Sequence, residues 1–186
     1  MAAPSQRARG VPAGDRPAAT GHAGAWLAGT AAACIAAVAA ALVSQHAFDM
    51  QPCPWCVLQR LIFLAIALAC GIALVSRCPR WRRAGAGLGL VLALCGVAAA
   101  LWQHFRAAAS ASCNLTLADR IVGATQLDRL LPDVFEPRAS CADAAVKLFG
   151  VPYDYWSLAL FALAAAVLWR VLRGSSGLGR SVSARR

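Results

Sequence analysis

Two closely spaced cysteines are the residues of this sequence whose type and spacing point most directly to chemistry. In Cys53-Pro54-Trp55-Cys56 the thiols stand three residues apart, a separation at which they can close into a readily exchanged disulfide. Because Pro54 suits the first position of a helix, we expect Cys53 near a helix cap and Cys56 in the first turn. Unpaired backbone N–H groups and the helix dipole stabilise a thiolate there. The pattern therefore predicts a redox-active pair.

Two further cysteines, Cys113 and Cys141, are separated by a long stretch of sequence. Spacing alone leaves open a structural disulfide that closes this loop and contributes about 2–4 kcal/mol. It also leaves open a metal site made from these two cysteines together with Cys53 and Cys56, although the common zinc pattern needs a second Cys-x-x-Cys, and the sequence has none. We therefore expect no metal.

Capping signals around Cys141 predict local structure. Ser140 and Asp143 have the spacing of a capping box, so we expect a short helix from there to Phe149, ended by Gly150. This would place Cys141 at a helix start as well. A second short helix is predicted between the two cysteines, because Leu127, Leu130, Leu131, Val134 and Phe135 recur at helical spacing after Thr125, with an interruption at Pro132. An ordinary apolar loop cluster is the alternative.

The elements that must position these thiols are long apolar runs. The chain has 186 residues, of which 60% are hydrophobic and 14% charged, where a soluble domain carries about a quarter charged residues. Each run approaches the ~20 residues that cross a bilayer as a helix. We predict an all-α membrane protein, a four-helix transmembrane bundle, with spans at about 25–48, 57–76, 84–105 and 155–172.

The distribution of charge orients these spans. The net charge is +10, and the basic residues lie mostly beside the apolar runs, so membrane topology explains them better than nucleic-acid binding. Arginines dominate residues 1–24, the loop between the second and third spans, and residues 173–186, whereas the connections at about 49–56 and 106–154 hold most of the acids. We expect both termini in the cytoplasm, as disordered tails, and both acidic connections outside. A cleaved signal peptide is the weaker interpretation of the first run.

This topology divides the cysteines into two groups. Cys53, Cys56, Cys113 and Cys141 fall outside, in an oxidising compartment. The other cysteines lie in the spans or in the cytoplasmic loop, and we expect them to behave as small apolar or reduced side chains: Cys34, Cys70, Cys78 and Cys95.

A single charged residue, Arg60, lies near the start of the second span. It follows Cys56 by four residues, so the two side chains share one face of a helix. An arginine near the interface can extend its head group to water. The functional alternative is that the guanidinium polarises a carbonyl of a quinone and stabilises its reduced form.

Taken together, the stretches SQHAFDMQPCPWCVLQR and LPDVFEPRASCADAAVKLFGVPYDYWS, with Cys113 between them, resemble the disulfide bond formation protein B family of bacterial inner-membrane thiol:quinone oxidoreductases. The resemblance extends from about Gly24 to Leu172. It implies that Cys113 and Cys141 exchange with a periplasmic thioredoxin-like oxidase of the disulfide bond formation protein A type.

The same resemblance implies that Cys53 and Cys56 pass electrons to ubiquinone or menaquinone, with Cys56 nearest the ring and Arg60 in the quinone site. His46, His104 and Trp156 are similar to family positions, without an assigned role. The expected partners are thus this oxidase, a membrane quinone and the lipid bilayer, but no nucleic acid. Exchange would start when a partner thiolate attacks the Cys113–Cys141 disulfide.

Two rival interpretations remain at this stage. The vitamin K epoxide reductase family also combines loop cysteines, a Cys-x-x-Cys and a quinone, but there the loop pair precedes the Cys-x-x-Cys, and here it follows. The second is a non-catalytic membrane protein. If its disulfides were structural, they would resist mild reductant, and if its cysteines bound a metal, the protein would release that metal.

Overall fold

Long helices form the body of the protein in a computed structural model that describes residues 18–76, 78–107, 117–144 and 146–183. They are α1 (Ala18–Phe48), α2 (Pro54–Val75), α3 (Pro79–Trp102) and α7 (Tyr153–Ser183). Within the described residues, four helices are long and apolar enough to cross a membrane, over His22–Phe48, Pro54–Val75, Pro79–Arg106 and Tyr153–Gly174. The predicted four-helix membrane architecture is confirmed.

The helix bounds differ from the predicted spans mainly at the ends. α2 starts at Pro54 rather than 57, because Pro54 occupies its first turn and Cys53 caps it. α3 likewise starts earlier, with Pro79 in its first turn. α7 continues as helix to Ser183, where the sequence predicts a tail beyond residue 172. The continuation is polar and rich in Gly and Ser, so apolar periodicity could not reveal it.

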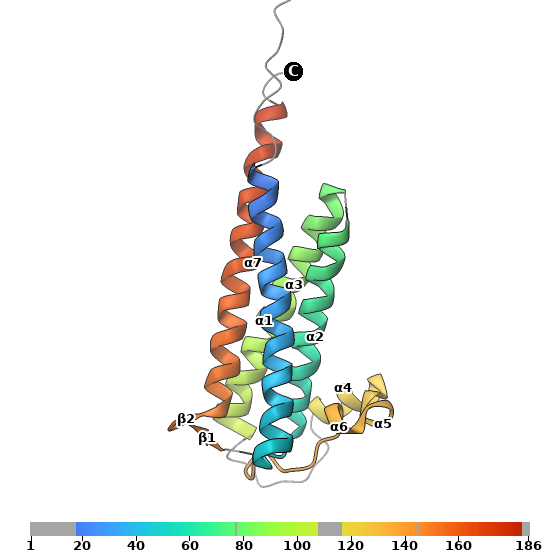
Figure 1. Ribbon diagram of the computed structural model, residues 1–186, viewed down its shortest axis with the longest axis vertical. Coiled ribbons are helices and arrows are strands. Elements are labelled where there is room, and N and C mark those ends of the chain that lie inside the picture. Colours follow the sequence, from blue (N-terminus) through green and yellow to red (C-terminus); the bar gives the residue numbers. More distant parts are fainter. Residues whose placement is uncertain (1–17, 77, 108–116, 145, 184–186) are drawn as a thin grey trace, which may run out of the picture.

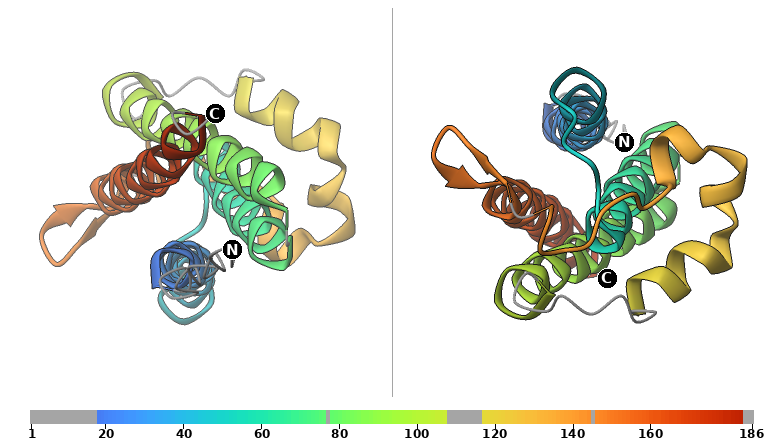
Figure 2. Two further views of the ribbon diagram at one scale, coloured as in Figure 1. Left: turned by 90° about the horizontal axis from the view of Figure 1, so that it is seen from above. Right: turned by 90° about the horizontal axis from the view of Figure 1, so that it is seen from below.

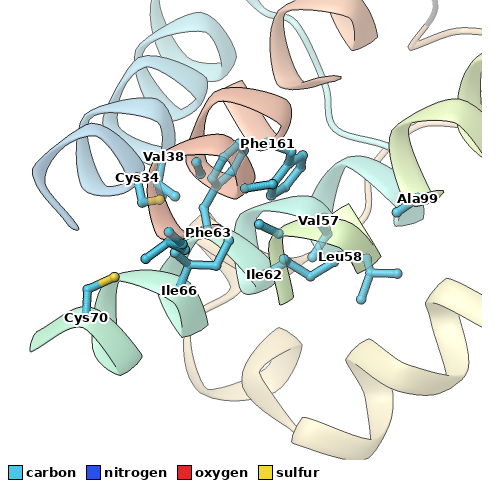
Figure 3. Packing of buried hydrophobic residues seen from close by; sticks show 14 of the residues in the cluster. Cys34, Val38, Val57, Leu58, Ile62, Phe63, Ile66, Cys70, Ala99 and Phe161 are labelled. Atoms are coloured by element: carbon cyan, nitrogen blue, oxygen red, sulfur yellow. The ribbon is translucent and has the colours of Figure 1, made fainter. Parts of the chain in front are cut away.

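The long helices pack in a ring in which α1 and α3 each contact both α2 and α7. Across the middle, the Phe63 ring of α2 stacks on Phe161 of α7 with centroids 3.9 Å apart and planes at 5° (Figure 3). Both rings are buried, and Phe161 packs against Gly96, one of several small buried residues on α3 that also include Gly89 and Ala93. Small residues allow close helix approach inside a membrane, where packing rather than water drives association.

Short elements gather at one end of this bundle (Figures 1 and 2). A π-helix, η1 (Gln103–Ala107), ends α3, and α4 (Leu117–Thr125), α5 (Leu127–Leu130) and α6 (Pro132–Phe135) follow. Short helices in the second connection are thus confirmed, and Pro132 interrupts them as predicted by starting α6. Thr125 ends α4, and its hydroxyl accepts from the Leu127 N–H at 3.4 Å, while Gln126 holds the cap position of α5.

The helix predicted from Ser140 to Phe149 is wrong. Ser140 Oγ does accept from the Asp143 N–H at 3.2 Å, but the turn stops there and an antiparallel hairpin follows, β1 (Lys147–Leu148) paired with β2 (Val151–Pro152). Phe149 and Gly150 form its turn, both with positive φ (53° and 82°). A glycine in the left-handed region ends helices and also closes hairpins, so the signal at Gly150 was real but ambiguous.

The packing of Gly96 can be tested by adding one methyl group. A Cβ at this position would overlap the Phe161 ring, whereas a Cβ at Gly87, on the same helix, meets nothing within 4 Å. We expect Gly96→Ala to lower the free energy of unfolding in mixed micelles by about 1–3 kcal/mol, because the stacked rings cannot yield. The control Gly87→Ala should be neutral or more stable by up to about 1 kcal/mol. Equal stability of the two variants would contradict this packing.

Candidate functional site

The Cys53–Cys56 pair lies at the first turn of α2, as predicted. Cys53 is the N-cap of the helix, and its sulfur accepts from the Cys56 backbone N–H at 3.3 Å. The two sulfurs are 3.0 Å apart in the dithiol form. Cys53 is fully buried and Cys56 half-buried. A short rearrangement of one sulfur would close the disulfide.

The second outer connection is tied to the first next to this pair. The backbone N–H groups of Arg138 and Ala139 both donate to the Pro52 carbonyl, at 2.9 and 3.2 Å. This bridge sets Cys141 against Cys53, with a hydrogen bond between the two thiols. The structure therefore brings Cys53, Cys56 and Cys141 together, whereas Cys113 lies outside the described residues.

Cys141 and Cys53, neighbouring thiols outside the spans, have pKa values shifted in opposite directions. The hydrogen bond with Cys53 lowers the pKa of Cys141, with a smaller contribution from the Trp55 backbone N–H. The same bond, together with that to Cys56 and with burial, raises the pKa of Cys53. Cys141 is therefore the preferred thiolate and lies next to Cys53. When Cys53 is in a disulfide with Cys56, Cys141 is placed to attack the Cys53 sulfur with Cys56 as the leaving group.

The Cys56 sulfur, by contrast, faces an amide network. Gln103 Nε2 donates to it at 3.3 Å, and Gln59 Nε2 donates to Gln103 Oε1 at 2.7 Å, which fixes how the Gln103 amide is turned. Both glutamines are buried, and Gln103 belongs to the π-helix η1, a type of turn that often occurs at functional sites. Donors aimed at a sulfur favour its thiolate.

Arg60 is buried, with only 5% of its surface exposed. One guanidinium nitrogen donates to Gln45 Oε1 at 2.7 Å and to the Val134 carbonyl at 2.9 Å, and the other donates to the Ala41 carbonyl at 3.4 Å. Because its donors end on protein oxygens, the alternative in which Arg60 extends to water does not describe this side chain. The cation instead joins α1, α2 and α6.

A cavity of about 240 Å³ lies beside these groups. Cys56, Arg60 and Gln103 line it together with Asp154, and its remaining wall is mostly apolar and built from small residues of α1 and from Phe63 and Leu160. A second apolar cavity of about 210 Å³ shares Phe63 and Leu160 and continues between α1 and α7. An apolar hollow with a few convergent polar groups is typical of a small-molecule site.

The other residues singled out from the sequence lie apart from this cavity or at its edge. Trp156 lines it, His46 is exposed at the end of α1, and His104 bonds to Asp154 behind it. Cys34 and Cys70 are buried in the helix core (Figure 3), whereas Cys78 and Cys95 are exposed.

Sequence reasoning missed the glutamines that serve Arg60 and Cys56. Gln45, Gln59 and Gln103 are each buried. The available signal was an amide inside or at the end of an otherwise apolar run, since polar groups at membrane depth are retained where they have partners or a function.

The opposed pKa shifts can be tested by alkylation of the reduced protein over a pH series, with each cysteine followed by peptide mass spectrometry. Because its pKa is lowered, Cys141 should reach its full iodoacetamide rate at a lower pH than a free cysteine peptide, for which the thiol pKa is about 8.5. Because its pKa is raised, Cys53 should remain slow across neutral pH. Exposed Cys78 serves as the accessibility control. A Cys53 rate that saturates before that of Cys141 would contradict the assignment.

Comparison with known proteins agrees with this geometry. The family model described as disulfide bond formation protein DsbB matches residues 23–171. A disulfide bond formation protein B of Herminiimonas arsenicoxydans is 31% identical over 132 residues, which cover 70% of this chain and 83% of the relative. That of Aromatoleum aromaticum is 33% identical over 141 residues, or 74% and 84% of the two chains.

A third relative, disulfide bond formation protein B 1 of Pseudomonas syringae pv. syringae, is 34% identical over 140 residues, covering 73% of this chain and 80% of its own. With the apolar helices, these matches make the chain a multi-pass inner-membrane protein of disulfide bond formation and a disulfide oxidoreductase. The chain belongs to the disulfide bond formation protein B family.

Proposed function

We propose that this protein reoxidises a periplasmic thioredoxin-like dithiol oxidase, of the disulfide bond formation protein A type, and passes the electrons to a membrane quinone. The observation that carries the proposal is the position of Cys56. Its sulfur accepts from the Gln103 amide, and it shares with the buried cation of Arg60 a cavity that adjoins a second one between α1 and α7.

The residues of the cavity fit a quinone. Its wall of small residues on α1 and the Phe63 ring suit an aromatic head group, and the adjoining hollow between α1 and α7 suits an apolar tail. Arg60 would hold a ring oxygen through guanidinium N–H groups other than the three that donate to Gln45, Val134 and Ala41, and Gln103 would be a further polar contact in the cavity wall. A bound quinone, ubiquinone or menaquinone, supplies a lipid-soluble acceptor of two electrons and two protons.

The exchange runs through the sulfurs in order. A partner thiolate attacks Cys113 of the Cys113–Cys141 disulfide, and the mixed disulfide resolves with the partner oxidised and both loop cysteines reduced. The Cys141 thiolate attacks Cys53, so that the Cys53–Cys141 bond forms and Cys56 leaves as a thiolate. Cys113 then attacks Cys141, which restores the loop disulfide and frees Cys53. Two electrons leave toward the acceptor as the Cys53–Cys56 bond reforms.

The position of Cys56 favours its role as the leaving group. The Gln103 donor and the nearby guanidinium stabilise negative charge at Cys56, whereas Cys53 has a raised pKa and stays a thiol. A lower-pKa thiol leaves faster from a disulfide. Attack by Cys141 on Cys53 therefore releases the sulfur that faces the cavity.

Four cysteines and Arg60 thus remain the proposed site: Cys53, Cys56, Cys113 and Cys141 for disulfide exchange, and Arg60 for quinone binding. The proposed organisation is a cytoplasmic tail over residues 1–24, a membrane domain over 25–172 and a second tail over 173–186. Both termini would lie in the cytoplasm.

Removing the guanidinium tests the quinone site. Arg60→Ala removes charge-assisted hydrogen bonds worth about 1.5–3 kcal/mol, so the KM for quinone should rise roughly 10- to 100-fold. Arg60→Lys keeps the charge and most of the packing but loses the second donor direction, so it should be intermediate. Thiol exchange at the loop cysteines, measured with a small dithiol, should persist in both.

The matched control is Arg129→Ala, an exposed arginine on α5. It should leave the KM for quinone unchanged. An Arg60→Lys protein that folds and shows the wild-type KM would remove Arg60 from the proposed quinone site.

Labelling of intact cells tests the orientation. Cys78 lies between α2 and α3, at the end of the bundle away from the short helices (Figure 1). A membrane-impermeant maleimide should label an Asp143→Cys variant from outside and should reach Cys78 only after permeabilisation. Labelling of Cys78 in intact cells, with Asp143→Cys protected, would invert the topology and contradict the proposal.

A further inference from the structure

A second polar cluster joins η1 to the first turn of α7 and takes no part in the exchange steps above. His104 Nδ1 lies 2.7 Å from Asp154 Oδ2, and the Tyr155 hydroxyl lies 3.1 Å from His104 Nε2. The Asp154 side chain is only 11% exposed, the His104 side chain is 30% exposed, and Tyr155 is exposed. The three groups therefore form a chain of hydrogen bonds that runs from the surface to a nearly buried carboxylate.

Asp154 stands between two hollows. It lines the cavity that holds Cys56 and Arg60, and it also lines a small hollow of about 30 Å³ with His104 and Tyr155. A carboxylate at the start of a membrane-spanning helix is rare and often functional, and this one has His104 as its partner. Its hydrogen bond to His104 selects the tautomer with the proton on Nδ1 and leaves Nε2 to accept from Tyr155.

The number of protons released and taken up in the proposed reaction indicates a function for this cluster. Closing the Cys53–Cys56 disulfide gives up two electrons and two protons, and reduction of a quinone to a quinol takes up two of each. The thiol protons are lost to water during exchange, because the attacking and leaving sulfurs react as thiolates. An equal number of protons must return to the cavity, whose remaining wall is mostly apolar.

We propose, on the basis of the function proposed above, that Tyr155, His104 and Asp154 form a proton path from the outer water to the cavity of Cys56 and Arg60. Water, directly or through the Tyr155 hydroxyl, protonates His104 at Nε2, and the imidazolium passes its Nδ1 proton to the Asp154 carboxylate. The carboxylic acid so formed releases that proton into the cavity. His104 is left with its proton on Nε2, and exchange with water returns the proton to Nδ1. The net change is one proton moved inward.

Few charged or titratable groups line the two hollows beside the path. The small hollow is otherwise lined by Ala100, Leu101, Phe105 and Leu158, which do not titrate. On the cavity side the titratable or charged groups are Cys56 and Arg60 from α2 and Tyr153 from α7. Arg106, two residues after His104 in η1, lies over the Trp102 ring with its guanidinium carbon 5.7 Å from the centroid.

Two kinds of measurement test the path. In quinone-free protein with 15N-labelled histidine, NMR should show His104 protonated at Nδ1, with that signal shifted in Asp154→Asn and the Nε2 signal shifted in Tyr155→Phe. In quinone-loaded protein, Asp154→Asn should slow single-turnover quinol formation by about 100-fold, the order of a lost proton donor, while Asp154→Glu retains most of the rate. Disulfide exchange should be unchanged in both variants.

Chemical rescue separates a proton path from a structural tie. Added imidazole should restore quinol formation in His104→Ala, and the control His46→Gln, an exposed histidine on α1, should behave as wild type. Wild-type rates in Asp154→Asn would overturn the path and leave the proposed function standing. Equal losses in Asp154→Asn and Asp154→Glu without imidazole rescue would also overturn it. Wild-type protein that exchanges disulfides but leaves quinone oxidised would overturn both proposals.

Discussion

The buried guanidinium of Arg60 is the interaction on which the rest of the site depends. A cation at membrane depth must be surrounded by oxygens, and here these come from the Gln45 side chain and from the carbonyls of Ala41 and Val134. The charge thereby joins α1, α2 and the end of the second outer connection. Gln45 extends the joint, since its Nε2 donates to the Asp133 carbonyl at 3.2 Å. One residue thus supports the cavity and positions the loop that bears Cys141.

A single backbone carbonyl likewise positions the sulfurs. The Pro52 carbonyl accepts from both Arg138 and Ala139, so the backbone next to Cys53 is also what holds Cys141. Cys53 then has Cys141 on one side and Cys56 on the other, which is the order in which a disulfide would be passed inward. Proton and electron routes would reach the cavity from different elements, the sulfurs through α2 and Asp154 through α7.

Much of this arrangement could be predicted from the sequence, and the reasons are local. Apolar length defines the membrane helices, and Pro54 defines the start of α2, so the positions of Cys53 and Cys56 follow from their neighbours. The family is also recognisable, because its cysteine and arginine pattern is short and specific.

The parts that sequence reasoning missed depend on contacts between distant segments. Nothing local to Gln103 indicates that its amide meets Cys56, 47 residues away. Likewise, nothing local to Asp154 indicates that it bonds to His104, 50 residues earlier. Around Cys141 the local signals were misleading: Ser140 and Asp143 do bond, but the chain then forms a hairpin, because Phe149 and Gly150 both adopt the left-handed conformation of its turn.

In the proposed reaction, the electrons of a protein dithiol leave through Cys56 into a quinone beside Arg60. The direct measurement uses the purified full-length chain in lipid nanodiscs with added ubiquinone, driven by a reduced thioredoxin-like oxidase, and counts disulfide and quinol in the same sample. The account predicts one quinol for each disulfide formed in the oxidase. Disulfide exchange that reaches Cys53 and Cys56 while the quinone stays oxidised would contradict it.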